Sequence, residues 1–429
     1  MQKRILIFAL VMGLVVMVPL FSGGNQEKEA EEKPVVIMIR TGDEADALQA
    51  VADAYEEATG ITVVVNEQGR AGYFESLSTR LLAGTDDVDL VFFPSTYVAQ
   101  FAEADTLESL DKYLEDSSIT DESTLDFDDF LVTYSYKDDL YAIPTDVSAH
   151  FLFYREDLIP DPPQTWDEVL EIASKFTQKY NADSPTVWGA SFDALAPEEG
   201  PKIFYTMMWS YGGYIIDETG KVGINSEGAV RAMRNWQKMI SEGLISPETN
   251  NWGFTEVLEA LTSSSVAMGS PFWNAAYDPI LNSGTPQADT VKITLAPGVK
   301  QSDGSIYRTP FQHGWTLIMN KASKNKEAAW KFLQWATGKE GGTVHAKHGG
   351  TPARKSILSD PQFKDSRPDF ELMLKTLEIA KAEPQVVFYD EMHEAVNVAI
   401  ARVLSEGWDA QKALDEAAKT IQALVDKNM

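Results

Sequence analysis

The N-terminal part of the chain alternates apolar runs with segments of helical periodicity. Apolar runs at residues 35–39, 61–65 and 89–93 predict three strands. Between them, residues 48–55 and 74–81 carry apolar side chains at helical spacing, which predicts two helices. Strand, helix, strand, helix, strand, with strands this apolar, is typical of a parallel sheet that is covered by helices.

The carboxyl ends of these three strands are where a ligand is expected. Ligands of open parallel sheets bind in the crevice beyond the carboxyl ends of the strands. Those ends fall at residues 40–43, 66–69 and 94–97. Polar and charged residues are frequent in all three segments, so they supply hydrogen-bonding groups for a polar ligand.

The middle of the chain predicts a crossing between two domains and then further elements. Residues 141–154 (YAIPTDVSAHFLFY) are strand-like on both sides of a polar centre, which we interpret as the crossing. Thr165 followed three residues later by Glu168 is a capping box, so a helix is expected to begin there. Residues 226–242 predict another helix and residues 266–268 a short strand.

Residues 313–354 are the most informative stretch. A Gly-Trp pair opens an apolar strand over 315–319, a Ser-Lys-Asn-Lys segment then starts a helix, and a glycine-rich turn closes the unit. This order brings an aromatic side chain and exposed backbone together at the start of a strand, a common way to hold a small ligand with apolar faces. From residue 370 onward the pattern is mostly helical.

Length and composition limit the class of protein. A chain of 429 residues with 44% hydrophobic residues is globular, and two domains are expected. The net charge of −29 argues against nucleic acid and anionic membranes as partners, because both would repel the protein.

The first 24 residues predict a cleaved signal peptide. Lys3 and Arg4 form a charged start, an apolar run covers 5–18, and small residues follow. An uncleaved anchor is the alternative, since residues 5–21 are almost long enough to span a bilayer. Residues 25–33 are highly charged and are expected to form a flexible leader.

The chain has no cysteine, which excludes disulfides, thiolate metal sites and a lipid anchor on an N-terminal cysteine. An exported protein without a tether must be confined in another way, and a periplasm is the simplest compartment.

His345 and His348 have the spacing of two metal ligands on a helical turn, but the neighbouring glycines and lysine make a metal site unexpected.

Four segments together resemble one protein family. They are residues 141–176, 207–248, 266–273 and 313–354. In content, order and spacing they are similar to the extracellular, periplasmic solute-binding proteins of ABC-type sugar importers, sugar-binding family 1, a group that includes the maltose-binding protein. The resemblance covers nearly the whole chain after the leader.

The resemblance implies an α/β fold of two lobes. Each lobe would be a mostly parallel sheet flanked by helices, and crossing hinge segments would join the lobes around a ligand cleft. The N-terminal lobe is expected to comprise residues 34–146 plus 319–365. The C-terminal lobe is expected to comprise residues 147–318 plus 366–429.

On the N-terminal side, the resemblance implies four ligand-binding residues. Phe93, Ser95 and Thr96, after the third strand, lie where relatives present an aromatic and polar groups to the sugar. Asp43 lies at a position that often holds a polar ligand contact. From its position alone, Asp43 could equally cap the helix that begins beside it.

Three further candidates come from the crossing segments and the later strands. Ser148 falls where the maltose-binding protein carries a carboxylate, which suggests a different sugar or hydroxyl pattern. Trp273 matches the stacking tryptophan of the family, and Trp315 belongs to the Gly-Trp element that many relatives share. Without the resemblance, either tryptophan is as consistent with core packing, since tryptophan is mostly buried.

The expected function is that of a periplasmic carbohydrate-binding receptor that captures a sugar in the cleft and delivers it to an ABC transporter permease. The receptor is expected to be a monomer, with no catalytic residues, cofactor or metal. One alternative is an exported glycosidase, because glycoside hydrolysis needs only two placed carboxylates. Another is the same fold binding a non-sugar solute such as a glycerol phosphodiester, a polyamine or a peptide. Arg40, Arg70 and Arg308 leave the phosphodiester open.

Overall fold

Two paired strands run through the centre of the structure, which is a computed structural model that describes residues 33–196 and 198–428. They are β5 (Asp139–Arg155) and β11 (Gln312–Met319), and they pair antiparallel. The expected signal peptide, residues 1–24, and all but the last residue of the expected leader lie outside the described residues.

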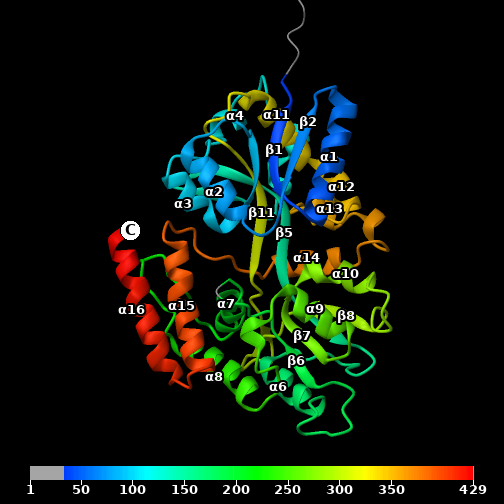
Figure 1. Cartoon of the computed structure of the whole chain (residues 1–429), viewed down its shortest axis with the longest axis vertical. Helices are drawn as coiled ribbons and strands as arrows, with labels where there is room; N and C mark the ends of the chain where they lie inside the picture. Colours follow the sequence, from blue (N-terminus) through cyan, green and yellow to red (C-terminus); the bar gives the residue numbers. More distant parts are fainter. Residues whose placement is uncertain (1–32, 197, 429) are drawn as a thin grey trace, which may run out of the picture. The chain divides into compact units, whose positions relative to one another are not determined.

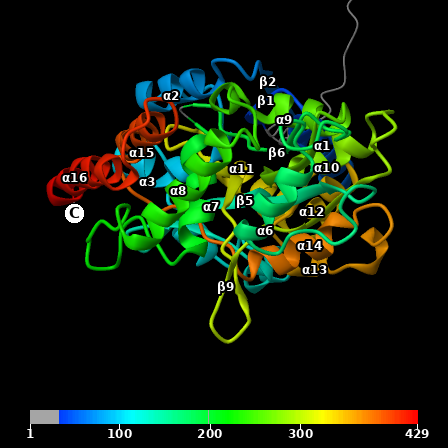
Figure 2. The ribbon, with the colours of Figure 1, turned by 90° about the horizontal axis from the view of Figure 1, so that it is seen from below.

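The main sheet follows the order β2-β1-β3-β11-β5-β7-β6, with β4 and β8 also paired to β5. The other strands are β1 (Val35–Arg40), β2 (Val63–Gln68), β3 (Leu90–Pro94), β4 (Tyr134–Tyr136), β6 (Trp188–Ser191), β7 (Val266–Trp273) and β8 (Val291–Leu295). A separate hairpin of β9 (Val299–Lys300) and β10 (Ile306–Tyr307) extends away from the rest (Figure 2).

Strand directions in the main sheet are mixed. β1 pairs parallel with β2 and β3, as expected from the apolar runs, and β6, a strand that the sequence did not predict, pairs parallel with β7. Around β5 and β11 all pairs are antiparallel. The expectation of mostly parallel sheets is therefore met only at the two ends of the strand order. The reason is that β5 leaves the first group of strands and β11 returns to it, so the two must run in opposite directions.

The strands and helices form two lobes that β5 and β11 connect (Figure 1). The first lobe contains β1 to β4 with α1 (Asp43–Thr59), α2 (Tyr73–Ala83), η1 (Ser95–Tyr97), α3 (Val98–Glu103), α4 (Asp111–Leu114), α5 (Glu122–Leu125), η2 (Phe127–Asp129), α11 (Lys326–Thr337), α12 (Lys339–Lys347) and α13 (Lys355–Leu358). The second lobe contains β6 to β8 with α6 (Trp166–Lys175), α7 (Gly200–Ser210), α8 (Glu227–Ser241), η3 (Thr249–Asn251), α9 (Phe254–Thr262), η4 (Asn274–Ala276), α10 (Tyr277–Leu281), α15 (Tyr389–Leu404) and α16 (Ala410–Asn428). Between them the chain passes through η5 (Pro361–Phe363) and α14 (Asp369–Leu377).

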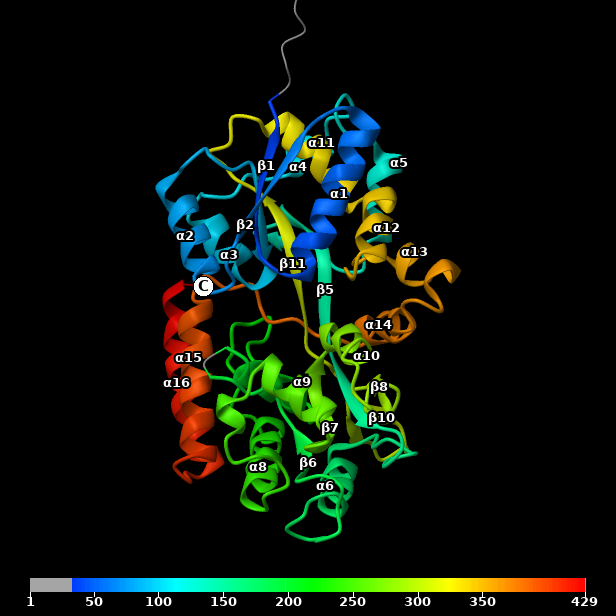
Figure 3. The same ribbon diagram turned by 45° about the vertical axis from the view of Figure 1, so that its right-hand side comes forward.

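The first lobe has a core on each face of its sheet. Side chains alternate between the two faces along a strand. Ile37 and Phe92 therefore pack on the face covered by α1 and α11, whereas Met38 and Phe93 pack on the face covered by α2 and α3. In the second lobe, α7, α8, α15 and α16 enclose the largest core, and α15 and α16 lie side by side (Figure 3).

The capping box that the sequence predicts is present. Thr165 is the N-cap of α6, its Oγ1 accepts a hydrogen bond from the backbone N–H of Glu168 at 3.2 Å, and Glu168 Oε2 accepts from the backbone N–H of Thr165 at 3.2 Å. α8 begins after Ser226, as predicted, because the Ser226 hydroxyl accepts from the Ala229 N–H at 3.5 Å.

Several strands are longer than their apolar runs predict. Residues 141–154 belong to a single strand, because the polar centre of β5 pairs with β11 through partners such as Ser148 and His313. β7 continues past residue 268 to Trp273 because it pairs with β5 as far as His150. Main-chain pairing, rather than apolar side chains, sets these ends.

The expected lobe boundaries remain a prediction, because residues Pro34–Met429 form one compact unit by their internal contacts.

Along the part of the chain that the structure describes, the helices are all too short or too polar to cross a membrane.

Arg354 connects distant parts of the first lobe. Its side chain is 1% exposed, and its Nε donates to Asp129 Oδ2 at 2.9 Å. Its terminal nitrogens donate to the carbonyl oxygens of Leu125, Thr337 and Asp126 at 2.9–3.0 Å.

We expect Arg354→Met to lower the free energy of unfolding by about 3 kcal/mol or more, because it removes the cationic partner of the mostly buried Asp129 carboxylate, which keeps only the Ser356 donors, and the donor of three carbonyls. Urea unfolding measures the change. Lys331→Met is the matched control, since it removes only an exposed ion pair with Glu327 and should cost less than about 0.5 kcal/mol. Equal effects of the two substitutions would contradict the role of Arg354.

Candidate ligand-binding cleft

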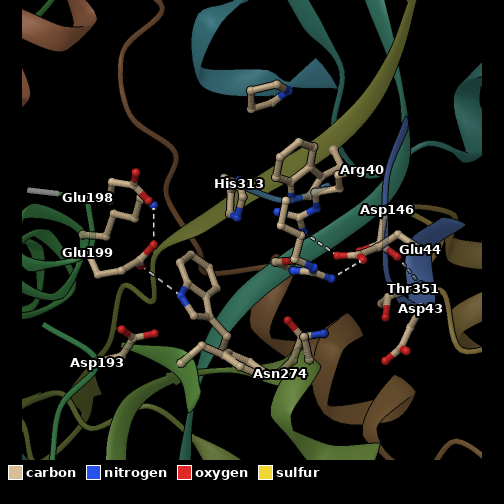
Figure 4. A pocket seen from close by; sticks show the side chains of 18 of the residues that line it. Arg40, Asp43, Glu44, Asp146, Asp193, Glu198, Glu199, Asn274, His313 and Thr351 are labelled. Carbon is tan, nitrogen blue, oxygen red and sulfur yellow. Dashed lines mark hydrogen bonds and ion pairs between the residues drawn. The ribbon is translucent and has the colours of Figure 1, made fainter. Parts of the chain in front are cut away.

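A cleft of about 990 Å³ lies between the two lobes. β1, α1 and η1 line it from the first lobe, β5 and β11 form its centre, and α7, β7 and α15 line it from the second lobe. Figure 4 shows Asp193, Glu198 and Glu199 on one side and Asp43 and Glu44 on the other. The volume suits a small organic ligand.

Three ring side chains form a row across the cleft, which we call the aromatic row: Trp273 at the end of β7, and His313 and Trp315 on β11. The ring centroids of Trp273 and His313 are 4.9 Å apart, and those of His313 and Trp315 are 6.4 Å apart. The row offers apolar ring surface along the centre of the cleft.

Both tryptophans of the row also serve the packing of the protein. Trp273 is 7% exposed and contacts His150 with a centroid distance of 4.2 Å. Trp315 stacks on Phe92 at 4.8 Å, and the Arg40 guanidinium lies 3.9 Å from its ring centroid. The two interpretations of these tryptophans, packing and ligand contact, are therefore compatible, although the ring area left for a ligand is reduced.

His313 is neutral. Burial, with the positive charges of Lys202 and Arg40, holds the pKa of its imidazole well below the usual range. It can thus act as a hydrogen-bonding ring without adding charge to the cleft.

The first-lobe rim of the cleft carries a compensated charge cluster. Glu44 on α1 forms ion pairs with Arg40 and Arg70, the latter at 2.8 Å. Burial acts to raise the pKa of Glu44, but the two guanidinium groups outweigh it, and the pKa lies below the usual value. Gly42 has a φ of 133°, and a Cβ there would lie 2.3 Å from Arg70 Nη2. The positive φ favours glycine here, and a side chain would also displace the Arg70 guanidinium that pairs with Glu44.

At the centre of the cleft, Asp146 on β5 is 9% exposed and already has two partners. Its Oδ2 accepts from the Thr351 N–H at 2.7 Å and lies 3.3 Å from His345 Nε2. Ser148, two residues along the strand, is the register partner of His313. The same stretch of β5 thus brings one carboxylate and one hydroxyl to the cleft.

On the second-lobe side, Glu199 joins two groups that line the cleft. Its Oε2 accepts from Trp273 Nε1 at 3.0 Å, and its Oε1 accepts from Lys202 Nζ at 2.9 Å. Burial acts to lower the pKa of Lys202, but Glu199, Glu383 and Glu198 outweigh it, so Lys202 stays charged. Trp273 is held in place by this carboxylate.

One contact bridges the two lobes across the cleft. The Tyr97 hydroxyl on η1 donates to Asp390 Oδ1 on α15 at 2.7 Å. The ring of Tyr97 also meets that of Tyr389 with a centroid distance of 4.9 Å. The Asp390 carboxylate and burial both raise the pKa of Tyr97, so the hydroxyl remains a donor at neutral pH.

Five of the seven predicted ligand-binding residues line the cleft: Asp43, Thr96, Ser148, Trp273 and Trp315. Asp43 is the first residue of α1, whereas Gly42 is its N-cap, so Asp43 is not the capping residue. Their contact with a ligand stays a prediction.

Phe93 and Ser95 do not line the cleft. Phe93 is fully buried on the face of the sheet that α2 and α3 cover, with its ring centroid 5.2 Å from that of Phe101. Ser95 is 1% exposed, and its hydroxyl accepts from the Gly314 N–H at 3.0 Å. The geometry gives no support to a ligand contact for either side chain.

Most residues of the second-lobe wall were not predicted from the sequence. Asp193, Glu199 and Lys202 line the cleft there, as do Tyr389 and Asp390. Asp193 follows the carboxyl end of β6, so the rule used for the first lobe could have found it. That strand has four residues and no long apolar run, and it was not recognised.

The lining is acidic. Eleven Asp and Glu side chains and four Lys and Arg side chains line the cleft, an excess of seven carboxylates.

Among the described residues, no group of three or more His, Asp or Glu side chains is arranged to hold a metal ion. His345 contacts Asp146, whereas His348 contacts the carbonyl oxygen of Val344 at 2.9 Å, so these two histidines have separate partners.

Known proteins share both the sequence pattern and the fold. Residues 50–369 match the family model described as bacterial extracellular solute-binding protein. The chain is 26% identical over 428 residues to the erythritol/L-threitol-binding protein of Mycolicibacterium smegmatis, covering 93% of this chain and 87% of that protein. It is 27% identical over 418 residues to a Sinorhizobium fredii protein named as a probable amino-acid ABC transporter periplasmic-binding protein, covering 91% of this chain and 88% of that protein.

Among solved structures, a maltose-bound T. maritima protein has the same fold, with a TM-score of 0.76 and 23% identity, covering 91% of this chain and 99% of that chain. The resemblance drawn from the four sequence segments is confirmed by the family match, which spans more than half of the chain. The protein belongs to the bacterial extracellular solute-binding protein family.

Proposed function

We propose that the protein is a periplasmic receptor that binds a carbohydrate in the cleft between its lobes and delivers it to an ABC transporter permease. The observation that carries the proposal is the aromatic row with polar side chains on both sides. A sugar has apolar C–H faces and a rim of hydroxyl groups. Contact with the rings of the aromatic row would remove the apolar faces of the sugar from water. Asp43, Thr96 and Ser148 offer hydrogen bonds to its hydroxyl groups.

Membership of the solute-binding family supports a binding function, and two of the three similar proteins are named for or solved with a polyol or a sugar, whereas the third is named for amino acids. One similar protein is named for erythritol and L-threitol, and a protein of the same fold was solved with maltose. Polyols and sugars share the hydroxyl rim that the cleft side chains suit. No chemical step is part of the proposal.

The cleft does not favour a phosphate ester. Its cationic lining residues already have acidic partners: Arg40 and Arg70 pair with Glu44, Lys202 with Glu199, and Arg367 with Asp369. Arg308, the third arginine considered for such a ligand, is not among the lining residues. A phosphate would meet an excess of carboxylates and no unpaired cation among the described lining residues.

Ligand capture is proposed to close the lobes around the sugar. A ligand that contacts both lobes binds the closed form better and shifts the population toward it. The hydrogen bond between Tyr97 and Asp390 supports this proposal, because it joins the lobes directly. The permease would recognise the closed pair of lobes.

The proposal is tested by a calorimetric binding screen. The screen contains mono- and oligosaccharides and sugar alcohols, each with its amino and N-acetylamino analogue. We expect at least one of them to bind with a Kd in the micromolar range or below. Glycerol phosphodiesters and short peptides are the controls and should not bind, and binding of a polyamine without any carbohydrate would contradict the proposal. Absence of binding by every carbohydrate would contradict the proposal. Hydrolysis of a chromogenic glycoside, lost on mutation of a cleft carboxylate, would favour an enzyme instead.

Trp273→Phe should weaken binding of the sugar found in that screen about tenfold, because the smaller ring buries less of the sugar face and the hydrogen bond to Glu199 is lost. Phenylalanine keeps the packing against His150, so the melting temperature should change little. Trp408→Phe, outside the cleft, is the matched control and should leave the affinity unchanged. An unchanged affinity for the Trp273 variant would remove this residue from the site.

The protein is proposed to reach the periplasm through cleavage of residues 1–24, with no lipid anchor. Mass spectrometry of the protein recovered from an osmotic-shock fraction should give a chain that begins near residue 25. A full-length chain in the membrane fraction would contradict cleavage and favour the anchor alternative.

A further inference from the structure

Asp193 differs from every other buried acidic side chain in the described residues. Six Asp and Glu residues are buried there, and the other five accept hydrogen bonds: Asp89, Glu108, Asp146, Asp369 and Glu383. Asp193 is 1% exposed, and neither of its carboxylate oxygens accepts a hydrogen bond from any protein group. Buried polar groups are nearly always paired, so an exception requires an explanation.

The carboxylate is held at the wall of the cleft by its backbone. Asp193 lies two residues after β6, and it lines the cleft near Glu199 (Figure 4). On either side the chain is anchored, because the Ala194 N–H donates to the Trp252 carbonyl at 3.0 Å and the Phe192 carbonyl accepts from the Thr249 hydroxyl at 3.3 Å. These bonds fix the position of the Asp193 backbone at the wall of the cleft.

The charges around Asp193 favour a cation. On this side of the cleft, Glu198 and Glu199 lie directly before α7, and Asp390 and Glu394 lie on α15. Lys202 is the cationic side chain of this wall among the described lining residues, and its ammonium group is engaged by Glu199. A neutral ligand would leave this excess of negative charge in place, whereas a positive group would reduce it.

The neighbouring rings favour the same kind of group. Trp273 and Tyr389 line the same side of the cleft. Aromatic faces attract ammonium groups, and Trp273 already has Lys202 Nζ 5.7 Å from its ring centroid. Asp193 and the aromatic row line the same cleft, so one ligand can present an amine to the carboxylate and its apolar faces to the rings.

We propose that Asp193 forms a subsite for a protonated amine, so that the ligand is a cationic amino sugar or amino polyol. The inference rests on the proposed function, which it narrows from carbohydrates in general to carbohydrates that carry an amine. The carboxylate would accept hydrogen bonds from the ammonium group, and the ring faces beside it would complete the contact.

The protonation of Asp193 makes the binding of an amine depend on pH. Burial raises the pKa of its carboxyl well above the usual value, Glu199 and Glu256 raise it further, and Lys202 opposes them. Glu199 is the N-cap of α7, Lys202 lies on α7 and Glu256 lies on α9. An ammonium group binds the deprotonated form, so binding should release a proton below the raised pKa. Affinity for the amino sugar should therefore increase with pH until the pH approaches the pKa of the ligand's own amine.

The test compares matched ligands: each hexose or hexitol of the screen, the analogue with one hydroxyl replaced by an amine, and the N-acetylated, neutral form of that analogue. Calorimetry on the full mature chain should show that an amine form binds at least about tenfold more tightly than both neutral forms. In Asp193→Asn this preference for the amine form should fall below about threefold. The increase of the affinity for the amine form with pH should also disappear. Asp53→Asn, an equal charge change on the outer surface of α1, should retain both.

Each outcome is decisive. Neutral sugars that bind as tightly as their amine forms would overturn the inference and leave the proposed function intact. A preference for amines that survives in Asp193→Asn would place the amine elsewhere and also overturn it. If no carbohydrate of any form binds, the proposed function itself fails. The variant should melt at the same temperature as the wild type or higher, because it removes an unpaired buried carboxyl, so loss of fold does not explain a lost preference.

Discussion

The antiparallel pairing of β5 with β11 is the interaction on which the arrangement of the cleft depends. A strand with a polar centre can continue only if its backbone groups are paired, and β11 supplies those partners from Gln312 to Ile318. The same pairing sets which side chains meet at the cleft. It aligns Ser148 with His313 and Asp146 with Trp315, so the carboxylate, the hydroxyl and two rings are presented together at the centre of the molecule.

The two walls of the cleft differ in whether their buried acidic side chains have cationic partners. On the first-lobe rim, Glu44 is neutralised by two arginines, which lowers its pKa in spite of burial. On the second-lobe wall, Lys202 is engaged by Glu199, and Asp193 is left without a partner. A buried carboxyl without a donor is destabilising. Our proposal attributes this uncompensated carboxyl to ligand binding, and the charge of the two walls therefore differs.

The aromatic side chains show that packing and binding are not exclusive roles. Trp273 is held by Glu199 through its indole N–H and by His150 through its ring, yet it still lines the cleft. Trp315 lies against Phe92 and Arg40 and lines the cleft as well. Rings fixed in this way lose little conformational freedom when a ligand binds, which favours affinity.

Local patterns in the sequence determined the elements and part of the site. The capping box at Thr165 and the helical spacing of residues 48–55 depend on neighbours a few positions away, so they could be predicted and were confirmed. The family resemblance pointed to Thr96, Ser148 and Trp273, which line the cleft, and their contact with a ligand stays a prediction. Tertiary structure alone decided that Phe93 and Ser95 lie behind that surface, and that Asp193 and Asp390 lie on it. Whether a side chain finds a partner, a core or a cleft depends on contacts between segments far apart in the chain, and no local pattern encodes those contacts.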